Sequence, residues 1–135
     1  MTSRRLFLVL ALGALVTWPT LAAEQTLAQG SWTTKGYDIA GQWKIVQEEG
    51  KLFVVLDPAF RTKKAPDLKI FLSPKPLAQL NNRNATQDSL RVGPLQKSRG
   101  AQRLEIPSGT SLDEYKTVLI HCEKFSKLWG GAALR

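Results

Sequence analysis

The dominant pattern of this chain is a series of short apolar runs. Each run is bounded by glycine, proline or polar turn residues. They are rich in β-branched and aromatic side chains, a composition typical of strands. The runs that predict strands are residues 43–47, 52–56, 68–72, 101–106, 116–122 and 132–134. The first two predict a hairpin, because the four residues between them include Gly50.

Helical signals are brief by comparison, and no segment sustains helical periodicity. Residues 77–89 are polar and predict a loop with at most one helical turn. Ser111 and Glu114 have the spacing of a capping box, which predicts one helical turn before the strand at 116–122. The sequence therefore predicts an all-β fold, either an antiparallel β-sandwich or a barrel-like domain of short strands.

The N-terminus has the parts of an export signal. Arg4 and Arg5 precede an apolar run over residues 6–16, and residues 20–22 resemble a small-x-small cleavage site. The run is shorter than the ~20 residues of a membrane-spanning helix, and no second such run follows. We therefore expect an exported protein, periplasmic or extracellular, with no membrane span in the mature chain. The arginine pair suits twin-arginine and general secretory export alike.

One domain is expected after this signal. The predicted divisions are a signal peptide at residues 1–22, a flexible leader at 23–35 and a β domain at 36–135. The chain has 19 Lys and Arg residues, so losing Arg4 and Arg5 leaves 17 against 11 Asp and Glu, a net charge of +6. These cations are spread without an arginine-rich tract, which favours a solvated surface or an anionic envelope partner over nucleic acid.

The candidate chemistry lies at His121 and Cys122, the only histidine and the only cysteine of the chain. One residue of each type cannot supply a blue-copper site, a Cys/His zinc site or a Cys-x-x-Cys-His haem attachment. Neighbouring strand residues also point to opposite faces, so the pair could share a metal ion only at a bulge. Four uses of Cys122 stay open: a mixed disulfide with a partner, a disulfide across a homodimer, sulfenic-acid chemistry, or ligation of a non-covalently held haem.

Strand alternation bears on the same two residues. Val118, Ile120 and Cys122 share one face, which predicts that Cys122 continues an apolar row toward the core. An inert, buried cysteine is consistent with that position. Lys124 would follow on the same face, where a cation could favour the thiolate. His121 falls on the other face, as a packing residue or as an accessory to the thiol.

Several blocks of the sequence together resemble the DM-thirteen domain family, an exported module also found beside DOMON domains in Skeletor-type animal proteins. The blocks are residues 37–41, Phe60, and residues 65–73, 92–95, 100–107, 118–125 and 129–134. The resemblance implies an all-β domain that transfers electrons through a cysteine matching Cys122. The chain departs from the family pattern at His121, where an aromatic residue is common, and at Leu104, where a tyrosine is common.

Two functions are therefore expected. The first is a small exported redox or electron-transfer module that uses Cys122 as thiol or cofactor ligand, with His121 beside it and a protein as redox partner. The second is a non-catalytic β-sandwich that binds an envelope component or a protein. A hydrolytic enzyme is disfavoured, because the single histidine has no triad spacing with serine and aspartate.

Overall fold

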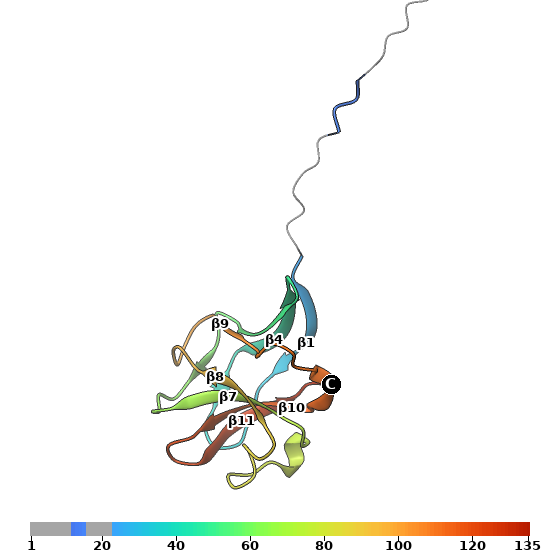
Figure 1. Ribbon diagram of the computed structural model, residues 1–135. Helices are drawn as coiled ribbons and strands as arrows, with labels where there is room; N and C mark the ends of the chain where they lie inside the picture. The colour runs from blue at the N-terminus through green and yellow to red at the C-terminus, as the bar shows by residue number, and fades with distance from the viewer. Residues whose placement is uncertain (1–11, 16–22) are drawn as a thin grey trace, which may run out of the picture.

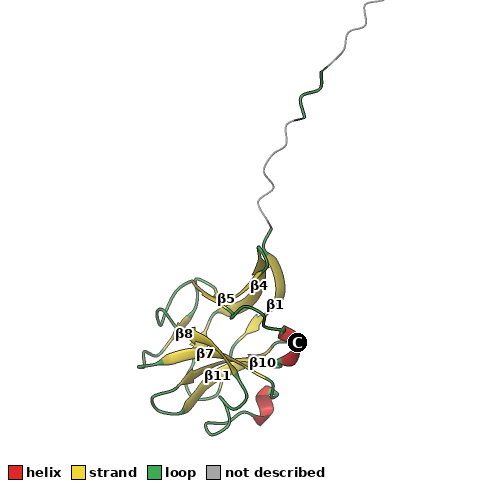
Figure 2. Cartoon of the chain, in the orientation of Figure 1, coloured by secondary structure: helices red, strands yellow, loops and turns green. Residues whose placement is uncertain are grey.

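The computed structural model describes residues 12–15 and 23–135, so most of the predicted signal peptide lies outside the described residues. The strands are β1 (Gln25–Ser31), β2 (Thr33–Thr34), β3 (Ile39–Ala40), β4 (Gln42–Glu48), β5 (Lys51–Leu56), β6 (Arg61–Thr62), β7 (Leu68–Ser73), β8 (Leu90–Pro94), β9 (Gln102–Glu105), β10 (Thr117–Cys122) and β11 (Lys127–Ala133). Two single 3-10 turns, η1 (Leu77–Gln79) and η2 (Leu112–Glu114), interrupt them (Figure 2). Over the described residues, no helix has the length and apolar character needed to span a bilayer.

Two antiparallel sheets form a sandwich. One sheet has the strand order β1-β4-β5-β9 and the other β2-β11-β10-β7-β8, while β3 and β6 form a separate two-stranded ribbon. In Figure 1, β1, β4 and β9 lie on one side of the domain and β7, β8, β10 and β11 on the other. The predicted all-β fold is confirmed in its sandwich form, because neither sheet closes into a barrel.

The main core lies between the two sheets and follows from the alternation of the strands. Ile45 and Val54 enter it from the first sheet, and Ile70 and Ile120 enter it from the second. All four side chains are fully buried. Burial of such side chains on two facing sheets is the main source of stability in a domain of this kind.

The predicted hairpin is confirmed. Glu48 pairs with Lys51, so only Glu49 and Gly50 connect β4 to β5. Both connecting residues have positive φ angles, 50° and 76°. Such a two-residue loop matches the twist of the flanking strands, and a glycine adopts it without strain.

The flexible leader predicted at residues 23–35 is wrong. β1 pairs along its length with β4, and β2 pairs with β11. β1 carries few apolar residues because it lies at the edge of its sheet, so it gave no period-two signal. Gly30 also belongs to the fold, since a Cβ there would lie 3.2 Å from the ring of Trp43.

The C-terminal strand is longer than predicted, because Gly130 and Gly131 lie inside β11 and do not end it. A Cβ on Gly130 would lie 2.6 Å from the carbonyl oxygen of Thr33, and one on Gly131 would lie 2.9 Å from that of Val118. Glycine is therefore required by the close approach of neighbouring backbones. The strand β8 was also missed, since Gly93 and Pro94 at its end are typical turn residues and mask its pattern.

A second, smaller apolar cluster covers the outer face of the β7-β10-β11 part of the sheet. Its buried members are Phe71, Leu80, Ala85, Leu119 and Leu128. We call residues 77–89, which supply Leu80 and Ala85, the outer cover. As predicted, this segment is a loop with one helical turn.

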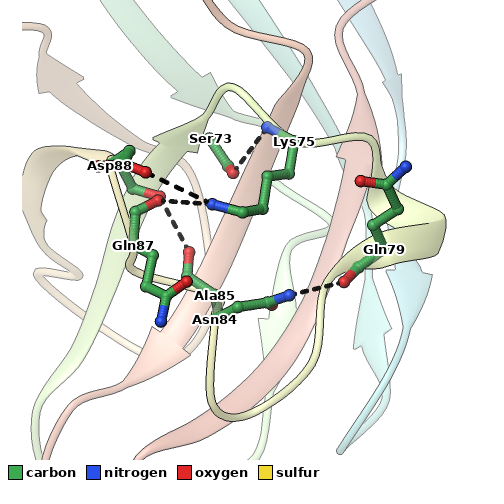
Figure 3. Close-up of polar contacts among 8 residues, drawn as sticks. Ser73, Lys75, Gln79, Asn84, Ala85, Gln87 and Asp88 are labelled. Carbon is green, nitrogen blue, oxygen red and sulfur yellow. Dashed lines mark hydrogen bonds and ion pairs between the residues drawn. The ribbon is translucent and has the colours of Figure 1, made fainter.

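Polar contacts hold the outer cover in shape (Figure 3). The Asn84 amide donates to the carbonyl of Gln79 at 2.8 Å, and the Lys75 ammonium lies 3.4 Å from the carbonyl of Gln87 and 3.8 Å from the Asp88 carboxylate. The cover is thus fixed by side-chain to backbone bonds as well as by its apolar anchors. The capping box predicted at Ser111 does not form, because its hydroxyl makes no capping bond and the following turn is 3-10.

Candidate functional site

β10 places Cys122 and His121 on opposite faces of a fully buried strand. The strand lies between β7 and β11, and all six of its residues are buried. Cys122 belongs to the main core together with Val118 and Ile120, as the alternation predicted. His121 faces the outer cluster, with its ring edge-on to Phe71 at a centroid distance of 6.0 Å.

The irregularity in this part of the sheet lies in β11. Ile120 pairs with Gly130 but His121 pairs with Leu128, so Trp129 is the extra residue of a bulge. The pairing of β10 with β7 is regular over the same positions. His121 and Cys122 therefore stay on opposite faces, and this arrangement does not let them bind one metal ion. Among residues 12–15 and 23–135, no group of three or more His, Cys, Asp or Glu side chains could hold a metal.

The thiol of Cys122 lies under a short stretch of exposed chain. Its side chain has no exposed surface, and its Sγ donates a hydrogen bond to the carbonyl of Pro66 at 3.1 Å. Pro66 is itself exposed. We call residues 63–67 the thiol cover.

An ion cluster fastens one end of the thiol cover to the sheet. The ammonium of Lys69, in β7, lies 2.8 Å from the Asp67 carboxylate and also contacts the Glu123 carboxylate. The backbone N–H of Glu123 donates to the carbonyl of Asp67 at 3.2 Å. Hydrogen bonds to Asp67 and then to Glu123 raise the pKa of Lys69, which keeps this lysine charged. The remaining members of the cover carry no comparable ion pair among the described residues.

Sequence reasoning missed Lys69 and Glu123. Lys69 looks like an interruption of an apolar strand, yet strand alternation places it on the face of Asp67 and directly opposite His121. A lysine in the middle of a buried strand is itself a signal, because such a charge needs a partner. The partner at Glu123 could not be found from local spacing, since it follows a different strand.

His121 sits beneath the outer cover as a neutral imidazole. It is 4% exposed, and neither ring nitrogen has a hydrogen-bond partner within the described structure. Burial lowers the pKa of this histidine, and the nearby Glu123 carboxylate opposes the effect only in part. Its contacts are those of a packing aromatic ring, on the side of the sheet away from the thiol.

The position predicted for Lys124 is wrong. β10 ends at Cys122, and a turn over residues 123–126 follows it. The ammonium of Lys124 lies over the ring of Phe125, 5.9 Å from its centroid. The period of two that would have put Lys124 beside the thiol ends with the strand.

Trp129 links the core around Cys122 to the surface. The indole N–H donates to the Thr62 hydroxyl at 2.9 Å, and the ring lies 4.3 Å from that of Tyr37, centroid to centroid. Lys63 and Lys127 hold their ammonium groups over the Tyr37 ring, at 4.7 and 4.6 Å. An aromatic pair therefore runs from the main core to a cationic surface.

A haem iron bound by Cys122 would need open space on one side of the sulfur. The sulfur is fully enclosed, and the Pro66 carbonyl occupies its polar contact. His121 cannot serve as a second ligand, because it faces the other side of the sheet. The residues present in this arrangement therefore do not fit a haem at Cys122.

The comparison with protein families decides what kind of domain this is. The family model described as Electron transfer DM13 matches residues 31–134. The chain belongs to the DM13 family. The matched residues include the whole of β10, the thiol cover and the ion cluster around Lys69. No curated protein matches the chain. Nor does any solved structure match it.

Membership of the DM13 family confirms the resemblance found in the sequence. It also supports electron transfer as the broad activity of the domain, with a protein as the kind of partner such a domain serves. The roles of Cys122 and His121 within that activity are not given by the family match.

Proposed function

We propose that this DM13 domain is an exported electron-transfer module that exchanges electrons with a protein partner through the thiol of Cys122. The carrying observation is the position of that thiol: the only cysteine lies at the end of its strand, and its polar contact is made by the exposed residue Pro66. The site is in the periplasm or outside the cell.

In this scheme the thiol cover moves aside and Cys122 loses its proton to solvent. The thiolate attacks one sulfur of a partner disulfide, forming a mixed disulfide and releasing the other partner sulfur as thiolate. A thiolate of a second protein, a reduced dithiol, then attacks the Cys122 sulfur of the mixed disulfide and releases the other partner thiolate. The remaining thiolate of that dithiol frees Cys122 as it closes a disulfide, so two electrons pass from the dithiol protein to the partner.

His121 has no direct part in this chemistry, because it lies on the other face of β10. Its proposed role is to pack the strand end against Phe71 and so to hold Cys122 in place. This assignment replaces the expectation that His121 assists the thiol.

Alkylation of Cys122 over a range of urea concentrations tests the proposal. We expect slow reaction of the folded protein, with a rate that depends only weakly on urea at low concentrations, as local opening of a short segment does. Cys122→Ser is the control, since its hydroxyl can still donate to Pro66 and no thiol remains. We expect Cys122→Ser to keep the fold and to lose thiol–disulfide exchange with a small disulfide.

The opposite outcome supports the second candidate, a non-catalytic binding module. Full burial of Cys122 is the observation that favours it. In that case the rate of alkylation would have the urea dependence of global unfolding, since only the unfolded chain would expose the sulfur.

A further inference from the structure

A second feature, separate from the thiol, is a pair of arginines that face each other across two antiparallel segments. Arg61 and Arg99 form a β-bridge. The backbone bonds next to it run from Thr62 N–H to the Ser98 carbonyl at 2.9 Å and from Gly100 N–H to the Phe60 carbonyl at 2.7 Å. This pattern makes the arginines a non-hydrogen-bonded pair, in which the Cα atoms are only about 4.5 Å apart and the side chains are closest.

More cations extend this pair along the same ribbon. Lys63 and Lys97 come two residues along from each arginine and line the same hollow. The four side chains line a hollow of about 820 Å³, together with Lys64 and a single carboxylate, that of Asp38. We call this hollow the basic groove.

None of the five cations of the basic groove forms an ion pair within the described part of the chain, although other cations do. Arg103, for example, pairs with both Glu24 and Glu48. Like charges directly opposite each other on paired strands destabilise a fold. The arginine pair is therefore unfavourable for folding, and an anion bound between the two guanidinium groups would remove that repulsion.

We propose that the basic groove binds a phosphate-bearing ligand, with one phosphoryl group held between Arg61 and Arg99. A phosphoryl monoester carries about −1.5 to −2 charges at neutral pH, so one group neutralises both arginines. A carboxylate carries one charge and would leave one arginine uncompensated. Guanidinium groups also bind phosphate oxygens in pairs, and the lysines supply charge for a second phosphate.

The same chemistry could come from a soluble phosphate ester or from the headgroup of a lipid with a terminal phosphate. The groove is independent of the thiol chemistry, although Lys63 and Lys64 belong to the thiol cover as well. Cys122→Ser therefore keeps the ligand site, so failure of the proposed electron transfer and failure of the phosphate site are separate results.

Calorimetric titration of the purified chain with pyrophosphate tests the site. We expect saturable binding that Arg61→Gln and Arg99→Gln each weaken by about tenfold or more, the effect of losing one charged hydrogen-bond donor set. Arg83→Gln is the matched control: it removes one charge from an exposed arginine in the outer cover, and we expect it to weaken binding by less than about twofold. Because Arg61 and Arg99 are exposed and repel each other, neither variant should lower the melting temperature.

Vesicles distinguish the two sources of phosphate. Tighter binding to phosphatidic acid vesicles than to pyrophosphate assigns a lipid headgroup, and the reverse order assigns a soluble ester. Three results would overturn the proposal: equal loss of affinity in the Arg83→Gln control, equal binding to phosphatidylglycerol vesicles of the same surface charge, or tighter binding of a polyglutamate peptide. The last result would indicate an acidic protein surface as the ligand.

Discussion

Cys122 and His121 are consecutive residues, yet the two sides of the sheet bury them in different ways. The thiol lies under the five-residue thiol cover, whose contact atom belongs to exposed Pro66 and whose firm anchor is the Asp67–Lys69 ion pair. The imidazole lies under the thirteen-residue outer cover, which inserts Leu80 and Ala85 into an apolar cluster. Cys122 has no exposed surface and His121 is only 4% exposed, yet different segments must move before each group is reached. Burial alone does not separate a reactive group from a packing group.

The largest expected effect comes from removing an anchor of the outer cover. Phe71→Ala should lower the free energy of unfolding by about 3–5 kcal/mol, because it leaves a cavity among Leu80, Leu119 and the ring of His121. Chemical denaturation measures this loss. Phe125→Ala is the control, since Phe125 is 61% exposed and should change stability by less than about 0.5 kcal/mol. Similar losses in both variants would mean that the outer cluster contributes little.

His121→Phe tests whether the imidazole serves only to pack. The two ring nitrogens are buried without partners, a state that costs about 1–3 kcal/mol for an unsatisfied polar group. A phenyl ring has the same approximate shape and can keep the edge-on contact with Phe71. We expect the variant to be more stable by up to that amount in urea denaturation, with alkylation of Cys122 unchanged. A loss of stability would point to an interaction that His121 makes through its nitrogens.

Much of this arrangement could be predicted from the sequence, and the failures have physical causes. The alternation of Val118 to Cys122 predicted which face each residue occupies, because successive side chains of a regular strand point to opposite faces of the sheet. The edge strand β1 could not be predicted, because its stability depends on pairing with β4 and not on its own apolar residues.

The candidate site was harder to predict for a similar reason. The thiol cover lies 56 residues from Cys122 in the sequence, and the Glu123 partner of Lys69 is 54 residues away. No local spacing encodes either contact. The same holds for Arg61 and Arg99, whose opposition depends on the register of two segments that do not look like strands.

A smaller effect is the dependence of stability on pH. The pKa of His121 is lowered in the folded state, while in the unfolded chain it returns to the ordinary value near 6.5. Below that pH the unfolded chain binds a proton that the folded protein does not, so stability falls as the pH drops. The slope from this one proton is at most about 1.4 kcal/mol per pH unit.

Urea midpoints of wild type and His121→Phe between pH 7.5 and pH 5 measure the contribution of His121 to the pH dependence of stability. The neighbouring charged groups, Glu123 and Lys69, are present in both proteins, so the difference between the two curves isolates the imidazole. We expect the curves to diverge as the pH is lowered, with the wild type losing more stability. Parallel curves would show that the imidazole is free to take up a proton in the folded state.

The smallest expected change in stability, and the most direct test of the comparison, comes from Asp67→Asn. Asp67 has a φ of 67°, a conformation that asparagine also tolerates, so the substitution removes the charge and keeps the backbone. Losing the ion pair with Lys69 should ease opening of the thiol cover by about 1 kcal/mol, which is roughly a fivefold faster alkylation of Cys122.

Asp88→Asn is the matched control in the outer cover. Asp88 has a φ of 56° and lies 3.8 Å from the ammonium of Lys75, so it too is an aspartate in a left-handed turn beside a lysine. It belongs to the outer cover, and its substitution should leave the alkylation rate of Cys122 unchanged. If both variants accelerated alkylation equally, the thiol would be reached by general loosening of the fold. A faster reaction in Asp67→Asn alone would assign access to the thiol cover, because Asp88 pairs with a lysine outside that cover.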